Sequence, residues 1–233
     1  MQEALALGEA VDWRPVERPA RTSLRGSHVL VRPVDPADAE PLFAVSHLPD
    51  GDPAIWTYLP DGPYESPDDL RRMLTWAASS DDPLYFTLAG FPDERPAGIA
   101  AYLRITAEFG VIEIGHIWFG LALQRTTAAT EAIYLLARHA FDVLGYRRLE
   151  WKCNALNVAS RRAAERLGFT FEGVFRKHQV VKGRNRDTAW YAITDDEWSA
   201  IRLGYEAWLA PENFDGDAQQ KQSLGELIRV ARR

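Results

Sequence analysis

Residues 111–145 read VIEIGHIWFGLALQRTTAATEAIYLLARHAFDVLG and place a strand, a polar turn and a long helix in direct succession. Apolar residues alternate along 111–119, as in a strand with one buried face. From Thr127 the apolar positions follow helical spacing, and Gly145 ends the helix. Such a helix start presents unpaired amides and the positive end of the helix dipole, which suits a pyrophosphate group. An ordinary Thr-capped helix is the alternative interpretation.

The sequence on either side of this unit predicts strands and helices of an α/β fold. Before it, the patterns predict strands at 28–34, 84–90 and 97–106, and helices at 38–46 and 67–80. After it, they predict a strand at 148–154, a helix at 157–167, strands at 169–175 and 179–193, and a helix at 195–209. The three strands from 84 to 119 are expected to form an antiparallel meander.

Composition limits the class of protein. The chain has 233 residues, of which 46% are apolar, so it can form one globular domain with extensions. A net charge of -6 argues against nucleic acid as a partner. No run approaches the roughly 18 apolar residues of a membrane span, and the start of the chain lacks the features of a signal peptide. These features predict a cytoplasmic protein without a membrane partner.

The turn at 124–130 resembles the acyl-CoA signature of the GNAT superfamily of N-acyltransferases, Q/R-x-x-G-x-G/A. Gln124, Thr127 and Ala129 occupy its positions, with Thr127 in place of the usual glycine. The resemblance implies acetyl-CoA as co-substrate and requires no metal. The implied cofactor-binding residues here are Leu123, Gln124, Arg125, Thr126, Thr127, Ala128, Ala129 and Thr130, with Arg125 able to add a charge-assisted contact.

A second block, CNALNVASRRAAERLGFTFEGVFR at 153–176, resembles the RimJ/RimL-type branch of that superfamily. The branch carries an N-x-x-S helix start followed by K/R-L-G-F and E-G. It implies that Asn157 and Ser160 meet the pantetheine arm and that Arg161 meets a phosphate. Many members outside this branch place a tyrosine that reprotonates the leaving thiolate where this chain has Ala164, so Ser160 is the candidate acid. Asn157 is also a sound helix cap in its own right.

Acetyl transfer needs a neutral amine, so a carboxylate or histidine must take the proton, directly or through one water. Glu113 and His116 are the candidates, and their spacing sends them to opposite faces of the strand unless a bulge intervenes. Glu113 is preferred because several GNAT enzymes carry their base two residues before the Gly or Ala of this strand. A solvated Glu113 and a structural His116 are the alternatives. A bulge would also free an amide to polarise the thioester carbonyl.

Aromatic and basic residues suggest where the acceptor binds. The predicted substrate pocket comprises Trp56, Tyr58, His116 and Trp118, for some of which core packing is the alternative. The hairpin at 169–193 is basic, carrying Arg176, Lys177, Lys182, Arg184 and Arg186, and is either solvated or in contact with a CoA phosphate or an acidic substrate. Cys153, the only cysteine, excludes an intramolecular disulfide and is expected to be buried and inert.

The resemblance covers about residues 24–198 and implies a mixed, twisted sheet flanked by helices, with the cofactor in a V-shaped opening between strands 111–119 and 148–154. We expect an N-terminal arm (1–25), an N-acetyltransferase domain (26–198) and a C-terminal helix and tail (199–233). The tail docks on its own domain or on a second copy in a homodimer. The predicted reaction is direct acetyl transfer to a primary amine of a small molecule or protein N-terminus. A silent acyl-CoA-binding module is the alternative.

Overall fold

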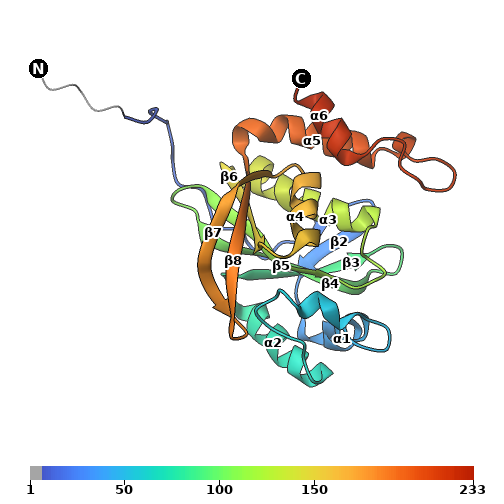
Figure 1. The fold of residues 1–233 in the computed structure, drawn as a ribbon. Coiled ribbons are helices and arrows are strands. Elements are labelled where there is room, and N and C mark those ends of the chain that lie inside the picture. The colour runs from blue at the N-terminus through green and yellow to red at the C-terminus, as the bar shows by residue number, and fades with distance from the viewer. Residues whose placement is uncertain (1–6) are drawn as a thin grey trace, which may run out of the picture.

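The computed structural model describes residues 7–233 and contains one eight-stranded sheet with helices on both faces (Figure 1). The strand order is β1-β2-β3-β4-β5-β6-β8-β7. The strands are β1 (Leu24–Arg25), β2 (Val29–Pro33), β3 (Leu84–Gly90), β4 (Arg95–Thr106), β5 (Val111–Phe119), β6 (Arg148–Asn154), β7 (Thr170–Val181) and β8 (Arg184–Thr194). The predicted α/β fold and the predicted meander of β3, β4 and β5 are confirmed.

The helices begin at the polar caps that the sequence supplies. They are α1 (Ala39–Ser46), α2 (Pro67–Ser79), α3 (Thr127–Arg138), α4 (Val158–Arg166), α5 (Asp195–Leu209) and α6 (Leu224–Ala231). Ser66, Thr126 and Asn157 each accept a backbone amide in the first turn of α2, α3 and α4. Shorter turns lie at η1 (Pro36–Asp38), η2 (Pro53–Trp56), η3 (His139–Val143) and η4 (Pro211–Asn213). The helix predicted to run past residue 138 continues there as the π-type turn η3.

Alternating side chains divide the sheet between two hydrophobic cores. Leu84 and Phe86 of β3 belong to the larger core, which also contains buried residues of α3, α5 and α6. Tyr85 points to the smaller core, which is covered by α1 and α2. In Figure 1, α1 and α2 lie below the sheet, and α5 and α6 lie at the opposite end of the molecule.

The sheet opens between β5 and β6, its only parallel pair among the described strands. Register is kept only from Val111 to Glu113, opposite 148–150. Beyond Glu113 the two strands diverge, and β6 continues along β8 instead. The V-shaped opening expected between these two segments is therefore present.

Segments near both ends of the described chain pack against this body. The Val16 amide donates to the Ala107 carbonyl at 3.1 Å, and the Trp13 indole donates to the Glu108 carbonyl at 2.8 Å. At the other end, Leu224 and Ile228 of α6 are buried in the larger core, so this part of the tail docks on its own chain. The expected domain boundaries stay a prediction.

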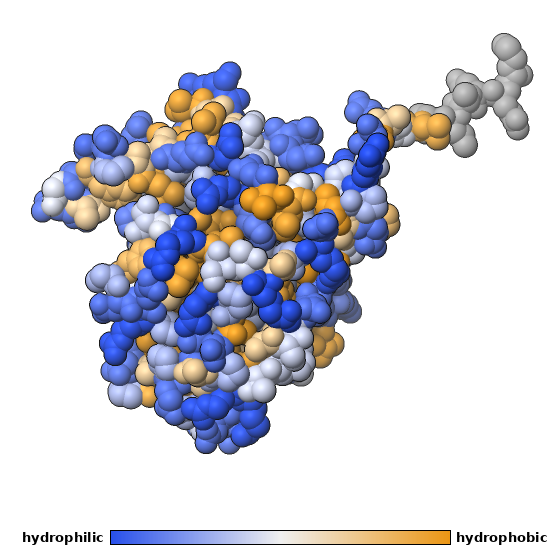
Figure 2. Space-filling model, turned by 180° about the vertical axis from the view of Figure 1, so that it is seen from behind, coloured by the Kyte–Doolittle hydropathy of each residue, from blue (hydrophilic) through white to orange (hydrophobic). Residues whose placement is uncertain are grey.

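On the face opposite to the one seen in Figure 1, the surface is largely hydrophilic, with apolar residues in separate patches (Figure 2). Within residues 7–233, no helix has both the length and the apolar character needed to cross a membrane.

Candidate active site

A bulge in β5 brings Glu113 and His116 to the same cavity. Pairing with β4 joins Ala101 to Gly115 and Ile99 to Trp118, so β5 carries one extra residue there. His116 has a φ of 49°, in the left-handed region. The extra residue breaks the period-two alternation, and both side chains line the cavity. The bulge that the sequence analysis named as a condition for a shared site is therefore present.

The cavity lies at the opening between β5 and β6 and has a volume of about 500 Å³. One part of its lining comes from β6 and the start of α4, including Cys153, Asn157 and Ser160. Another part comes from α2, β3 and the β7–β8 hairpin, including Trp76, Tyr85 and Arg186. Its size suits a small-molecule site. The cavity thus joins the helix start predicted to hold pantetheine to a wall built by distant segments.

Glu113 is held between two cations. Its side chain is only 3% exposed; Arg104 Nη1 lies 2.9 and 2.8 Å from its two oxygens and Lys152 Nζ lies 3.0 Å from Oε2. Gly115 leaves room for this carboxylate, since a Cβ there would lie 3.2 Å from Oε1. Burial raises the pKa of Glu113, against the opposing effect of Lys152 and Arg104. A solvated Glu113, the alternative considered from sequence, does not fit this burial.

The Lys152 contact belongs to a longer chain of ion pairs across the sheet. Lys152 Nζ also lies 2.5 Å from Glu150, and Glu150 accepts from Arg148 at 2.8 Å. Arg148 in turn contacts Glu172. Each charge in this chain thus has an opposite neighbour, and Lys152 is paired with two carboxylates.

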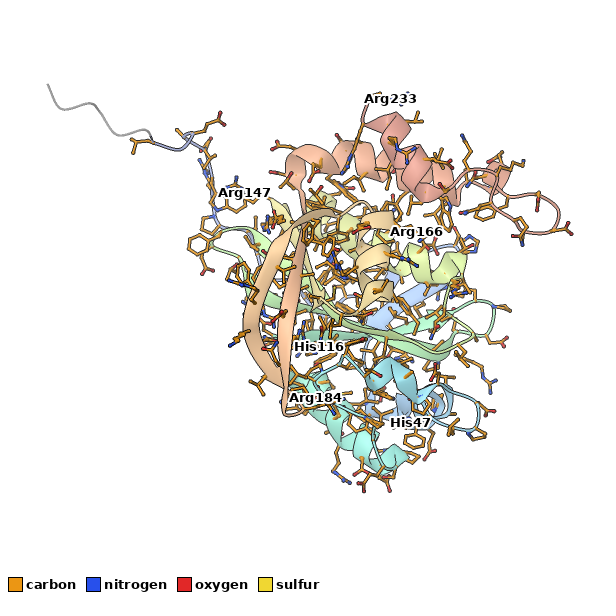
Figure 3. All side chains as sticks on the ribbon, viewed as in Figure 1. His47, His116, Arg147, Arg166, Arg184 and Arg233 are labelled. Atoms are coloured by element: carbon orange, nitrogen blue, oxygen red, sulfur yellow. The ribbon has the colours of Figure 1, made fainter. Side chains whose placement is uncertain are left out.

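His116 is paired with Tyr85, which the sequence interpretation did not single out. Tyr85 Oη and His116 Nδ1 lie 2.5 Å apart. Burial raises the pKa of the Tyr85 hydroxyl and lowers the pKa of His116, so both stay neutral near pH 7. Figure 3 shows His116 beside the β7–β8 hairpin, with Arg184 near the tip of that hairpin.

The start of α4 supplies a hydroxyl to the cavity. Trp151 Nε1 donates to Ser160 Oγ at 3.0 Å, and the Ser160 amide donates to Asn157 Oδ1 at 3.0 Å. Because Oγ accepts from the indole, the Ser160 hydroxyl can donate its proton to another group, and the Cys153 thiol lies within its reach. Cys153 is buried, as expected, and its burial raises the pKa of the thiol, so it is a poor nucleophile.

The predicted pyrophosphate turn lies at the start of α3, outside this cavity. Thr126 Oγ1 accepts from the Ala129 amide at 3.2 Å, and Gln124 donates to the Phe119 carbonyl. Within the described chain, the amides of Thr127 and Ala128 have no hydrogen-bond partner. The helix start therefore presents free donors to solvent.

Other predicted site residues are placed elsewhere. Leu123 belongs to the larger core, and Thr130 is buried and accepts from Arg166 at 3.1 Å. Arg161 lies outside the lining of the cavity and donates to the Tyr191 hydroxyl at 3.1 Å. Their roles in cofactor binding stay predictions.

Of the predicted aromatic pocket, the structure brings Tyr58 and His116 into the cavity but not Trp56 or Trp118. Trp56 and Trp118 are 2% and 5% exposed, with ring centroids 5.3 Å apart in the smaller core, beside a much smaller hollow. Core packing, the alternative considered from sequence, holds for these two. Their sequence neighbours, Ile55, Thr57, Ile117 and Phe119, carry no charge and gave no sign of the face that each tryptophan occupies.

The comparisons with known proteins agree with the fold described above. The profile of the acetyltransferase (GNAT) domain matches residues 28–170. A GCN5-related N-acetyltransferase from Brucella melitensis is 46% identical, with a TM-score of 0.90 over 94% of this chain and 99% of that one. "Probable N-acetyltransferase YjcK" of Bacillus subtilis (strain 168) is 26% identical over 181 residues, 75% of this chain and 99% of the relative.

A more distant structure was solved with ligands. The microcin C7 self immunity acetyltransferase MccE, in complex with acetyl-CoA and AMP, is 20% identical, with a TM-score of 0.64 over 72% of this chain and 93% of that one. At this identity the likeness shows the fold alone.

Proposed function

This chain belongs to the GNAT acetyltransferase family, and from that premise we propose that it moves an acetyl group from acetyl-CoA directly to a primary amine within the cavity between β5 and β6. It is an acyltransferase, and the GNAT fold uses acetyl-CoA. The observation that carries the proposal is that one cavity joins the start of α4 to a wall of aromatic and charged side chains. Both reactants can therefore meet in it.

The residues at the start of α3 fit the phosphates of acetyl-CoA. The free amides of Thr127 and Ala128 and the positive end of the helix dipole attract an anion. Thr127 is half-buried and Ala129 is small, so the backbone stays within reach despite the missing glycine. Arg125, which is exposed, adds a cation to the turn. The pantetheine arm then runs toward Asn157 and Ser160.

The β5 bulge fits the thioester carbonyl. His116 and Ile117 have no register partner on β4, and β6 has already left β5 at this point. Their backbone amides are therefore candidates for polarising the carbonyl oxygen in the transition state.

Glu113 is the proposed base. A carboxylate offers about four acceptor positions, and Arg104 and Lys152 take three of them, which leaves one for the amine or a bridging water. Its raised pKa makes it a better proton acceptor than an exposed glutamate. His116 is the second candidate, because its imidazole is neutral and also faces the cavity.

Ser160 is the proposed proton donor to the leaving sulfur. Its hydroxyl accepts from Trp151 and Ser160 lines the cavity, so the hydroxyl proton can be donated there to the leaving sulfur. We place the chain in the RimJ/RimL-type branch on residues 153–176. The acceptor is a small-molecule amine or a protein N-terminus, and the cavity volume of about 500 Å³ supports the small molecule.

The test is the release of free CoA thiol from acetyl-CoA over a panel of primary amines, with each acetylated product identified by mass spectrometry. We expect thiol release that depends on the amine and matches the amount of product. A rate of thiol release that is independent of the amine, with no acetylated product, contradicts direct transfer.

A further inference from the structure

Arg186 differs from the other basic residues of the β7–β8 hairpin. It lines the cavity, whereas Arg176, Lys177 and Arg184 are exposed. Its Nε is buried and has no hydrogen-bond partner among the described residues. Within 7–233 no carboxylate lies within ion-pair distance of its guanidinium. A half-buried cation without a partner costs stability, so an anionic ligand that pairs with Arg186 would be bound favourably here.

The charges around the cavity leave Arg186 uncompensated. The lining contains three cations, Arg104, Lys152 and Arg186, and two anions, Asp61 and Glu113. Arg104 and Lys152 are both bound to Glu113. Asp61 is exposed, and among the described residues it forms no ion pair with Arg186. An incoming anion therefore finds one free guanidinium.

The position of Arg186 assigns it to the acceptor and not to CoA. Arg186, Arg104 and Glu113 line the same cavity, and the charges of Arg104 and Glu113 both act on the pKa of Arg186, so Arg186 lies on the side of the proposed base. The CoA phosphates are a whole pantetheine arm away from the thioester, and their proposed site is the start of α3. Lys182 Nζ donates to the carbonyls of Trp56 and Asp61, which closes the hairpin onto the wall beyond the reacting centre.

Apolar and aromatic side chains make up much of the rest of that wall, beside the polar Asp61 and Gln179. Ile55, Leu59, Met73, Trp76 and Tyr85 line the cavity together with Arg186. Such a wall accommodates an apolar body but offers no second cation for an acidic chain. The pocket is therefore built for one anionic group beside an apolar part.

We propose that Arg186 binds an anionic group of the acceptor, so that the substrate is a primary amine that carries a carboxylate or a phosphate and an apolar body. The inference rests on the proposed acetyl transfer and adds the substrate class to it. The planar guanidinium can hold either anion through two parallel hydrogen bonds. A charge-assisted contact of this kind contributes a factor of about 10 to 100 to kcat/KM.

The experiment compares matched acceptors with and without the anion. L-phenylalanine is paired with L-phenylalaninamide, and O-phosphoethanolamine with ethanolamine, with CoA release as the readout. Because the charge also changes the basicity of the amine, the quantity compared is the ratio of kcat/KM within a pair, measured in each enzyme variant. We expect Arg186→Gln to lower the anion-to-neutral ratio about 10- to 100-fold.

Three controls separate recognition from folding. Arg184→Gln removes an exposed charge from the same hairpin and leaves the ratio unchanged, and Arg186→Lys retains part of it. The KM for acetyl-CoA stays the same in Arg186→Gln. The pair whose ratio responds identifies the anion as carboxylate or phosphate.

An unchanged ratio in Arg186→Gln overturns the inference, as does an equal loss in Arg184→Gln. Acetylation of the neutral amines alone overturns the inference and leaves the proposed function intact. If no amine of any kind is acetylated, both fail.

Discussion

The two sides of the β5–β6 opening differ in the groups that line them. The side assigned to acetyl-CoA consists of two helix starts, with small or neutral residues such as Thr127, Ala129 and Ser160. The side assigned to the acceptor gathers aromatic and charged residues, such as Trp76 and Arg186, from α2, β3 and β8. Backbone amides suffice to hold phosphates, so the first side needs only short local motifs. The second depends on side chains that meet only in the folded chain.

Glu113 stands where the two sides meet, and its substitution has the largest expected effect. We expect Glu113→Gln to lower kcat by roughly 100- to 10,000-fold, because the amine then has no base. Acetyl-CoA binding should be preserved, since the proposed phosphate site lies at the start of α3, away from Glu113. Steady-state CoA release measures the first effect and calorimetric titration the second. Glu108→Gln, in the exposed β4–β5 turn, is the matched control and should act like the unchanged enzyme.

The pH profile decides between the two candidate bases. The raised pKa of Glu113 places the acidic limb of kcat/KM above the ordinary value of 4.5. The decrease in kcat/KM caused by protonation of Glu113 should persist in His116→Gln and disappear in Glu113→Gln. The separate decrease caused by protonation of the acceptor amine should remain in both variants. Loss of the limb in His116→Gln alone would assign the base to His116.

A smaller effect is expected from a charge placed on the acetyl-CoA side. Thr127→Glu puts a carboxylate in the first turn of α3, where it suits the helix dipole but repels phosphates. We expect the KM for acetyl-CoA to rise about 10- to 100-fold, with little change in thermal stability. Thr127→Gln has the same shape without the charge and should change the KM far less. Equal effects of the two substitutions would show that bulk, not phosphate repulsion, is responsible.

Most elements of the fold could be read from sequence because their signals are local. The strands at 84–90 and 111–119 and the starts of α2 and α3 follow from alternation and capping residues. Helix α6 was missed, although Ser223 and Glu226 form the capping box that could have revealed it. The bulge at His116 had no local signal, because it arises from a mismatch in pairing with β4.

The residues of the candidate site divide in the same way, between those with a local sequence signal and those brought together by strand pairing. Asn157 and Ser160 could be predicted because they sit in a motif, and Glu113 because it precedes a glycine at a recognisable place. Lys152 and Arg186 could not be assigned, because strand pairing brings them close to Glu113 from 39 and 73 residues away. Parallel pairing of 111–113 with 148–150, had it been assumed, would have placed Lys152 beside Glu113.

A crystal structure of the full chain with acetyl-CoA tests whether the two substrates meet in this opening. We expect the pyrophosphate at the amides of Thr127 and Ala128, the pantetheine arm beside Asn157, and the thioester between β5 and β6 with its carbonyl oxygen at the His116 bulge. The cavity wall at Arg186 should stay free for the acceptor. A thioester bound away from the opening, or an adenosine phosphate seated on Arg186, would contradict the assignment of the two sides.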